Sequence, residues 1–372
     1  MEKQFKKVRV LFTIPNFDKA GGGKALLKIA LNLNRKFYEP LICCSHGSGN
    51  FFETVKKSGI KIYFHKTTHS MIPRIKGLIK CFKLAKYFKS LGPDLIHSFH
   101  YGPDYSEALS SWIVGIPWVY TKKNMNWGGT SKNGWFLRSI FASRIIIQNR
   151  DMSKFFPKNN KVHFIPRGVD TSEFFPRSKS KKLIGKYCIH SNEKIILTVA
   201  NLIPVKNIEI LIESFQYMII SNNNLRLIIV GDTDNEYGQK LISKSIDQIE
   251  KEKIIFTGKI LNVYDYLSIA DVFVLPTNNV GEGSPVALLE ALASGVVSIG
   301  SKVPGIKDIL SPFQANLFDP NDSFDLTEKL KKLLISNNNE LVKKQLSHIT
   351  NNYSIAIETS RHEEIYQSEI GS

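Results

Sequence analysis

Residues 272–310 read VFVLPTNNVGEGSPVALLEALASGVVSIGSKVPGIKDIL, and this stretch decides how the rest of the chain is interpreted. A short apolar run leads into a loop of Pro, Thr, Asn and Gly. Ser284 and Pro285 then mark a helix start, because Ser is a favoured N-cap and Pro a favoured first helical residue. The segment VALLEALA that follows is apolar apart from Glu290, and Gly295 marks its end. The pattern predicts a strand, a glycine loop and a buried helix.

Two carboxylates in this stretch require partners. A carboxylate on a buried helix costs several kcal/mol unless it is paired, which makes Glu290 a candidate ligand residue. Glu282 lies in the loop between Gly281 and Gly283, where backbone can approach a ligand closely. The first helical N–H groups lack partners and suit a phosphate, so the arrangement fits a sugar nucleotide. The alternative is that Glu282 is a solvated loop residue and Glu290 a core carboxylate bonded to backbone amides.

The pattern E-G-x-P-x-x-x-x-E-A-x-A-x-G, with Glu282 and Glu290 eight positions apart, resembles the E-x7-E motif of family 4 glycosyltransferases. The resemblance implies the α/β fold GT-B, in which two Rossmann-like doubly wound domains face a central cleft. It also implies transfer of a sugar from a nucleotide donor with retention of anomeric configuration. Glu290 would bind the ribose and Glu282 the donor sugar, beside Gly283, Ser284 and Pro285.

The segment TVANLIPVKN, residues 198–207, is similar to the V-G-R-L-x-x-x-K-G pattern of the same family. Lys206 stands at the lysine of that pattern, where the resemblance implies a cation that neutralises the departing diphosphate. Asn201 stands in place of an Arg, so one of two expected phosphate cations is missing among the donor-binding residues. Either Lys206 acts alone with the helix dipole, or another basic residue substitutes.

Glycines and histidines mark the first half of the chain. Residues 8–14 form a buried-type strand, and Gly22 and Gly23 belong to a glycine loop before a helix over 25–33. The loop has neither Walker nor dinucleotide spacing, so a tight turn and a ligand contact both fit. In the resemblance, these glycines match those that lie under the donor phosphates and the acceptor.

His97 and His100 fall at the C-terminal end of a predicted strand. Such strand ends line the ligand crevice of open α/β sheets, so both are candidates for acid/base or hydrogen-bonding roles, with a structural role as the alternative. His97 matches the family pattern D-x-x-H-x-H and is assigned to the acceptor side. His100 lies one place later than the second histidine of that pattern and is the catalytic candidate.

Composition and charge divide the 372 residues into two domains. Residues 1–175 carry 29 Lys and Arg against 10 Asp and Glu, whereas the remainder carries 21 against 23. The resemblance implies that residues 1–175 form the acceptor-binding domain and residues 176–352 the nucleotide-sugar-binding domain. The resemblance adds a final helix over 353–372 that crosses back to the first domain. Repeated strand and helix alternation predicts parallel sheets in both.

Several classes are disfavoured. Four cysteines without framework or C-x-x-C spacing indicate a reduced, cytoplasmic setting and no zinc site. Asp232 and Asp234 spell D-x-D, but the position resembles a turn of the family, so no metal and no cofactor are expected beyond a UDP- or GDP-sugar substrate. A sugar-nucleotide epimerase or hydrolase on the same fold is the alternative enzyme. A nucleic-acid binder is disfavoured because no base-reading motif is present.

Residues 74–89, RIKGLIKCFKLAKYFK, place apolar side chains at helical spacing among six basic residues, which include Lys80, Lys83 and Lys86, and no acidic residue. A core-facing helix would show the same stripe. An interfacial helix on anionic lipid would also require the uniform positive charge. We therefore hypothesise a glycan or lipid-linked acceptor in bacterial cell-surface polysaccharide synthesis, and a cytoplasmic enzyme peripheral on the inner face of the membrane.

Overall fold

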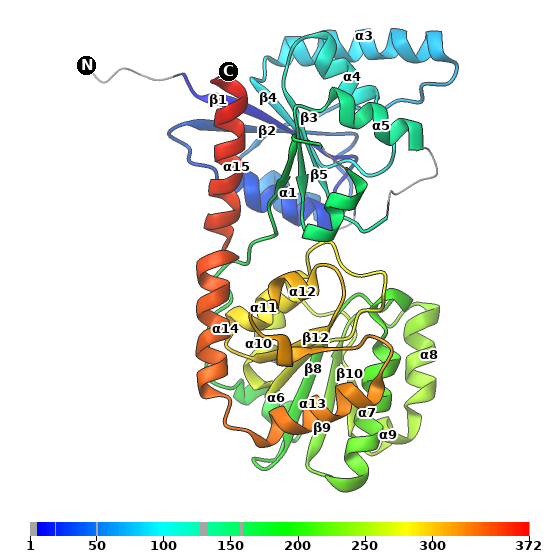
Figure 1. Cartoon of the computed structure of the whole chain (residues 1–372), viewed down its shortest axis with the longest axis vertical. Helices are drawn as coiled ribbons and strands as arrows, with labels where there is room; N and C mark the ends of the chain where they lie inside the picture. Colours follow the sequence, from blue (N-terminus) through cyan, green and yellow to red (C-terminus); the bar gives the residue numbers. More distant parts are fainter. Residues whose placement is uncertain (1–5, 19, 50, 127–131, 157–158, 372) are drawn as a thin grey trace, which may run out of the picture. The chain divides into compact units, whose positions relative to one another are not determined.

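The computed structural model describes residues 6–18, 20–49, 51–126, 132–156 and 159–371 (Figure 1). The chain divides into two compact units, Met1–Pro166 with Ile355–Ser372, and Arg167–Ser354. Each unit contains one parallel sheet with helices packed on both faces, which confirms the predicted α/β doubly wound class.

The first unit contains a sheet whose described strands run in the order β3-β2-β1-β4-β5-β6-β7, all parallel. The chain proceeds from β1 towards one edge and from β4 towards the other, so the strand order reverses between β1 and β4. The strands are β1 (Val8–Thr13), β2 (Tyr38–Cys44), β3 (Lys61–Phe64), β4 (Leu95–Ser98), β5 (Trp118–Lys122), β6 (Arg144–Ile147) and β7 (Val162–Phe164).

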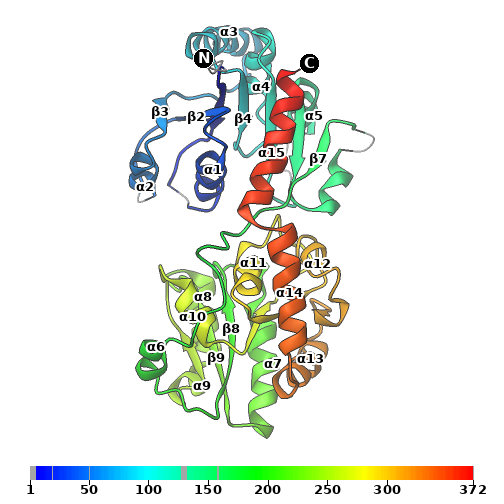
Figure 2. The ribbon, with the colours of Figure 1, turned by 90° about the vertical axis from the view of Figure 1, so that its left-hand side faces the viewer.

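Alternate residues of these strands face opposite helix layers, as the period of two requires. Val10 and Phe12 pack against α1 and α15, whereas Leu11 faces the core built with α3, α4 and α5. Figure 2 shows α15 lying beside α1. The helices of this unit are α1 (Ala20–Asn32), α2 (Phe52–Lys57), α3 (Arg74–Leu91), α4 (Ser106–Ile113), α5 (Lys132–Phe141) and α15 (Ile355–Ile370), with a 3₁₀ segment at Arg150–Phe155.

The second unit contains a parallel sheet in the order β10-β9-β8-β11-β12-β13, and its strand order reverses between β8 and β11. Its strands are nearly continuous apolar runs, as expected of a sheet covered on both faces. They are β8 (Lys194–Val199), β9 (Leu225–Val230), β10 (Ile254–Phe256), β11 (Val272–Leu275), β12 (Val297–Ser301) and β13 (Leu317–Phe318).

Two helix layers cover this second sheet. Leu197 and Phe273 pack with α6, α10, α11, α12 and α14, whereas Ile196 and Val274 pack with α7, α8 and α13. The helices are α6 (Lys181–Lys186), α7 (Ile208–Ser221), α8 (Glu236–Lys244), α9 (Ile246–Glu250), α10 (Val263–Ile269), α11 (Val286–Ala293), α12 (Ile306–Ile309), α13 (Ser323–Ile335) and α14 (Asn339–Asn352), with 3₁₀ turns at Pro204–Lys206 and Gln314–Asn316.

The unit boundaries lie at other residues than the expected 175 and 352. Arg167 donates its backbone N–H to Ser284 Oγ at 3.2 Å, and Val169 forms a parallel bridge with Ser354. These contacts assign the segment after Pro166 to the second unit. At the other end, Tyr366 and Glu369 of α15 contact His97 and Arg144 of the first unit.

Two helix starts were predicted wrongly. Helix α1 begins at Ala20, so Gly22 and Gly23 lie in its first turn and not in a loop. Helix α11 begins at Val286 with Pro285 as the N-cap residue, because the Ser284 hydroxyl accepts from Arg167 and makes no cap bond. The predicted end is confirmed, since Gly295 adopts a positive φ of 75° just after the C-cap Ser294. Within the described residues, no helix is long and apolar enough to cross a membrane.

Candidate active site

The predicted donor-binding residues of the second unit lie on two loops and on α11, and a third loop contacts the second of them. The three loops follow neighbouring strands. Residues 200–207 follow β8, residues 276–285 follow β11 and residues 302–305 follow β12. The carboxyl ends of β8 and β11 flank the point where the strand order reverses. Ligands of open α/β sheets bind at such switch points, so the geometry favours a binding site here.

Lys206 and Glu282 form an ion pair across two of these loops. The Lys206 ammonium donates to Glu282 Oε1, and the Thr277 hydroxyl donates to the same oxygen at 2.6 Å. The two charged side chains are only 17% and 13% exposed, so the pair is shielded from water and its attraction is stronger than at a surface. A backbone bond of 2.9 Å from Asn278 N to Val205 O holds the loops together.

The third loop fixes the backbone of Glu282. Its N–H donates to Pro304 O at 2.9 Å. Gly305 has a φ of 82°, and a Cβ there would lie 2.7 Å from Glu282 O, so this close approach requires glycine. Gly281 meets the Pro304 ring in the same way, at 2.8 Å from a built Cβ. Pro304 thus packs under the loop that carries Glu282.

Glu290 lies in the second turn of α11. Its side chain is partly exposed, whereas its neighbours Leu289 and Ala291 are buried. The carboxylate therefore reaches the surface of the helix and is not a core group. Gly283 and Ser284 lie between the Glu282 loop and the helix, and Pro285 caps the helix. Asn201 is exposed on the β8 loop, and Lys206 supplies the cation on that loop.

In the first unit, Gly22 and Gly23 serve close packing. A Cβ at Gly22 would lie 2.8 Å from Tyr101 Oη and 3.5 Å from Lys123 Nζ, and one at Gly23 would lie 2.7 Å from the Phe17 ring. The first turn of α1 is thus next to the loop that follows β4. This position is the switch point of the first sheet, since the strand order reverses between β1 and β4.

His97 is enclosed in the core of the first unit. Its Nδ1 lies 2.6 Å from Tyr366 Oη and its Nε2 lies 2.8 Å from Thr121 Oγ1, and the residue is 0% exposed. Burial, reinforced by His362 and Lys123, lowers the pKa of His97. Both ring nitrogens are engaged inside the fold, which favours the structural alternative for this residue.

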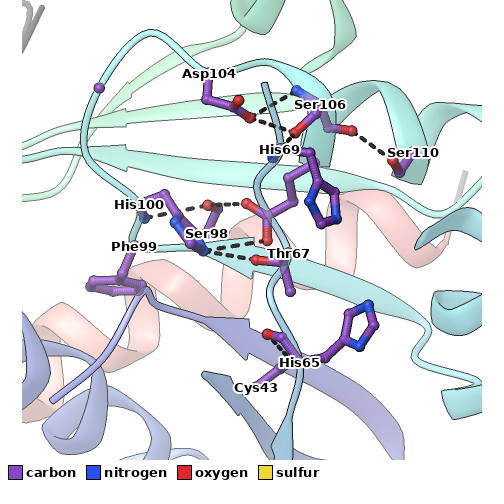
Figure 3. Close-up of polar contacts among 12 residues, drawn as sticks. Cys43, His65, Thr67, His69, Ser98, Phe99, His100, Asp104, Ser106 and Ser110 are labelled. Carbon is purple, nitrogen blue, oxygen red and sulfur yellow. Dashed lines mark hydrogen bonds and ion pairs between the residues drawn. The ribbon is translucent and has the colours of Figure 1, made fainter. Parts of the chain in front are cut away.

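His100 belongs to a buried polar cluster, which Figure 3 shows around β4 and the start of α4. His100 Nε2 lies 2.8 Å from Thr67 Oγ1 and 3.9 Å from Glu107 Oε1. Ser98 Oγ donates to Glu107 Oε2 at 2.6 Å, and Ser106 Oγ accepts from His69 N at 2.8 Å. Three segments of the chain, residues 67–69, 98–100 and 106–107, therefore meet at the carboxylate of Glu107.

Burial shifts the pKa values of the charged groups in this cluster. Burial raises the pKa of Glu107 and, with help from Arg138 and Lys123, lowers the pKa of His100. A neutral imidazole follows at pH 7, so His100 is suited to hydrogen bonding rather than to carrying charge. Glu107 Oε1 is buried and has no hydrogen-bond partner among the described residues.

Arg138 of α5 holds the loop that follows β4. Its guanidinium donates to the carbonyl oxygens of Gly102 at 3.3 Å, Asp104 at 3.0 Å and His100 at 3.4 Å. The guanidinium also stacks near the rings of Trp118, Tyr120 and Trp135, and the residue is 1% exposed. This clamp fixes the backbone of His100 and Tyr101.

Sequence reasoning missed Glu107, Arg138 and Thr67. A signal for Glu107 was present, because SEALSSW puts a carboxylate in the first turn of a helix directly after the histidine strand. Nothing local to Arg138 or Thr67 marks them, since their hydrogen-bond partners lie at least 33 positions away in the sequence.

No group of three or more His, Cys, Asp or Glu residues suited to a metal ion is present in the part of the chain that the structure describes. Asp232 and Asp234 form a turn, in which Asp234 N donates to Asp232 Oδ1 at 3.0 Å. The Asn235 side chain then caps α8. This local geometry fits the turn predicted from the sequence.

Comparisons with known proteins identify the family of the chain. Residues 20–173 match the family described as Glycosyltransferase Family 4, and residues 179–353 match Glycosyl transferases group 1. The Escherichia coli UDP-Gal:alpha-D-GlcNAc-diphosphoundecaprenol alpha-1,3-galactosyltransferase is 27% identical over 325 residues, covering 80% of each chain. The Staphylococcus aureus capsular polysaccharide biosynthesis glycosyltransferase CapH is 24% identical over 97% of this chain and 99% of its own length.

Solved structures show the same fold. A glycosyltransferase from Rickettsia africae has a TM-score of 0.86 at 18% identity, with 98% of this chain and 99% of that chain covered. Anabaena Alr3699/HepE in complex with UDP and glucose has a TM-score of 0.77 at 16% identity, with 97% and 100% covered. With both halves matched and the E-x7-E carboxylates placed at a switch point, this chain belongs to the family 4, group 1 glycosyltransferases of the GT-B fold.

Proposed function

We propose that the enzyme transfers a sugar from a UDP- or GDP-sugar to a lipid-linked or glycan acceptor, with retention of configuration and without a metal ion. The carrying observation is that Glu282 is held between Lys206 and Thr277 at the switch point of the second sheet, one loop before α11 and Glu290. The names of the E. coli and CapH relatives, which act on a diphosphoundecaprenol acceptor and in capsule synthesis, support this substrate class.

Donor binding divides between the two carboxylates and the helix start. Glu290 accepts hydrogen bonds from the ribose hydroxyls, and Glu282 accepts from the hydroxyls of the donor sugar. The amides of Gly283 and Ser284 and the first turn of α11 face the diphosphate. Lys206 is already oriented by Glu282, so its charge stabilises the leaving diphosphate without reorganisation during the reaction.

Retention is proposed from the family resemblance, and the surroundings of Glu282 limit how it could occur. The carboxylate is engaged by Lys206 and Thr277, which suits a hydrogen-bond acceptor better than a nucleophile that forms a covalent intermediate. In the proposed mechanism, the acceptor oxygen bonds to the anomeric carbon from the face that the diphosphate leaves. The C–O bond to that diphosphate breaks, and the hydroxyl proton passes to a leaving phosphate oxygen. NMR of the product should show the anomeric configuration of the donor; inversion would contradict the assignment.

Metal independence is tested by chelation. Activity should persist in EDTA, because Asp232 and Asp234 are engaged in a turn before α8. Loss of activity on chelation, with recovery on adding manganese, would overturn this part of the proposal.

Donor identity is tested by a thermal-shift panel of UDP, GDP and their sugars, with the Glu290→Ala variant as the matched control. One nucleotide series should raise the unfolding temperature of the natural protein clearly more than that of the variant. If the donor is consumed at the full rate without any acceptor, an epimerase or hydrolase takes the place of the transferase.

The acceptor side of the proposal is a lipid-linked diphosphate at the inner, anionic face of the membrane, with the enzyme acting as a peripheral cytoplasmic protein. His100, Tyr101 and Gly22 form the switch point of the first sheet and are the residues we assign near the acceptor. Turnover with diphosphoundecaprenol-linked sugars should exceed turnover with free glycans; the reverse preference would replace the lipid-linked acceptor with a glycan.

A further inference from the structure

Helix α3 exposes large apolar side chains although it packs on the first sheet. The exposed fractions are 75% for Ile75, 43% for Leu78, 51% for Ile79 and 56% for Phe82, and Ile72 just before the helix is 85% exposed. The residues that α3 turns inward are instead Gly77, Cys81, Leu84, Ala85 and Phe88. A core-facing helix would bury the whole stripe, but most of the apolar stripe predicted from the sequence is exposed among the described residues.

Small residues fix the orientation of α3. A Cβ at Gly77 would lie 2.7 Å from Met71 Cα, and Cys81 Sγ lies 3.6 Å from Met71 Sδ and 3.7 Å from Ser106 O. Rotating the helix to bury Ile75 and Phe82 would break these close contacts. The outward apolar face is therefore built into the packing of the helix.

The charge around this face has one sign. The helix carries no acidic residue, and its basic side chains are all exposed: Arg74, Lys76, Lys80, Lys83, Lys86 and Lys89. Apolar groups flanked by solvated cations need a partner that is apolar at its centre and negatively charged at its rim. An anionic lipid surface has this layering, because acyl chains lie below charged headgroups.

Neighbouring helices extend the same layer. Helix α3 packs on α4, and α4 packs on α5, on one side of the sheet (Figure 1). Trp112 of α4 and Phe136 of α5 are 63% and 66% exposed. Tryptophan is enriched at the level of lipid headgroups, which agrees with the charge argument.

We propose that the outward face of α3, defined by Ile75, Leu78, Ile79 and Phe82 with Lys80, Lys83 and Lys86, docks the enzyme on an anionic membrane surface. This inference rests on the proposed function, because docking brings the enzyme to a membrane surface that presents the lipid-linked acceptor. It assigns membrane binding to one helix of the first unit and to two separable contributions, apolar insertion and positive charge.

The test is sedimentation of the full chain with vesicles of phosphatidylglycerol or of phosphatidylcholine. The natural protein should bind the anionic vesicles. This binding should weaken from low to high salt, because salt screens the attraction between the lysines and the lipid headgroups. The triple variants K80E/K83E/K86E and I75S/I79S/F82S should each lose at least tenfold in affinity. The matched control K181E/K182E/K186E, with the same charge change on exposed lysines of α6, should keep it.

Equal binding to neutral vesicles, binding to neither, or an equal loss in the α6 control would overturn the docking face. Light scattering of the same proteins without vesicles tests whether the face instead binds a second copy of the chain. A dimer that I75S/I79S/F82S abolishes would assign the face to that second copy and refute the lipid surface. Unfolding temperatures of the variants establish that they are folded, since all the changed side chains are exposed.

Activity separates this inference from the proposed function. With a short-chain, water-soluble diphosphate-linked acceptor, the α3 variants should turn over like the natural protein; with the long-chain acceptor in anionic vesicles, they should lose at least tenfold. Equal activity of natural protein and variants in vesicles would refute the docking face alone. Inactivity of the natural protein on both acceptors would refute the lipid-linked acceptor while the vesicle binding result still stands.

Discussion

The two switch points of this protein are built in different ways. In the second unit, an ion pair between Lys206 and Glu282 lies on loops and keeps some contact with solvent. In the first unit, the carboxylate of Glu107 is enclosed with His100 and Thr67, and burial perturbs the pKa values of Glu107 and His100 in opposite directions. The first arrangement suits a charged ligand that enters and leaves, whereas the second suits a fixed scaffold under a binding surface.

The same contrast determines what the sequence alone could predict. Glu282, Gly283, Ser284, Pro285 and Glu290 lie within one short segment, so their proximity follows from local chain geometry. Lys206 is 76 positions away from Glu282, yet a second local pattern, strand then loop then helix, marks it. Parallel strand topology then brings the two loops to the same edge of the sheet.

Where sequence reasoning failed, tertiary contacts override local signals. Ser284 looks like an N-cap, but its hydroxyl accepts from Arg167, which is 117 positions away. The glycines before Lys24 look like a loop, but they form the first turn of α1, where packing against Phe17 and Tyr101 favours residues without a Cβ. Arg138 and Thr67 have hydrogen-bond partners that no local pattern identifies.

The largest effect should come from breaking the ion pair between Lys206 and Glu282. Lys206→Ala should lower kcat by about 10²–10³-fold, or ~3–4 kcal/mol, the scale of losing one group that stabilises developing negative charge. Steady-state kinetics with saturating donor measures this loss. Unchanged kcat would show that another basic residue supplies the charge in place of the Arg that Asn201 replaces.

A double-mutant cycle sharpens that test. Because Lys206 and Glu282 are paired, Glu282→Gln alone should lower kcat more than donor affinity, and the double variant should lose less than the two single losses combined. Additive losses would mean that the two side chains act independently, and the pair would then be a structural contact only.

A smaller effect is expected at Glu290, which binds but does not touch the reacting sugar. Glu290→Ala should weaken donor binding by about 10–100-fold, since a hydrogen bond to a charged group contributes ~1.5–3 kcal/mol. Calorimetric titration with the nucleotide identified by thermal shift measures it. Full affinity in the variant would remove Glu290 from the site.

The buried carboxylate of Glu107 should affect how the stability of the protein depends on pH. Burial raises the pKa of Glu107, so the folded chain binds that proton more tightly than the unfolded chain. Stability therefore falls as pH rises from the ordinary carboxyl range through the raised pKa. Glu107→Gln keeps an oxygen for the Ser98 hydroxyl and removes the ionisation. The difference in unfolding temperature between this variant and the natural protein should therefore shift in favour of the variant as pH rises. Glu213→Gln, at an exposed residue of α7, is the control and should show no such trend.

Lys122 should change the dependence of stability on pH in the opposite direction, and by a smaller amount. It is 3% exposed, its ammonium donates to the carbonyl oxygens of Asn124 and Asn126, and burial together with the charge of Arg138 lowers its pKa to about 8. The folded chain then binds this proton less tightly than the unfolded chain, whose lysine keeps its ordinary pKa of 10.5. Stability contributed by this group rises as pH increases from about 8 towards the unfolded value.

Lys122→Met abolishes that titration and also loses the two bonds to carbonyl oxygens, a loss that is the same at every pH. Only the slope is therefore diagnostic. Between about pH 7.5 and pH 9, the natural protein should gain about 1 kcal/mol over the variant, or ~2–4 °C in unfolding temperature, since each pKa unit corresponds to ~1.4 kcal/mol. Parallel curves for the two proteins over this range would mean that the ammonium is solvated, and that the first unit is less enclosed at β5 than at Glu107.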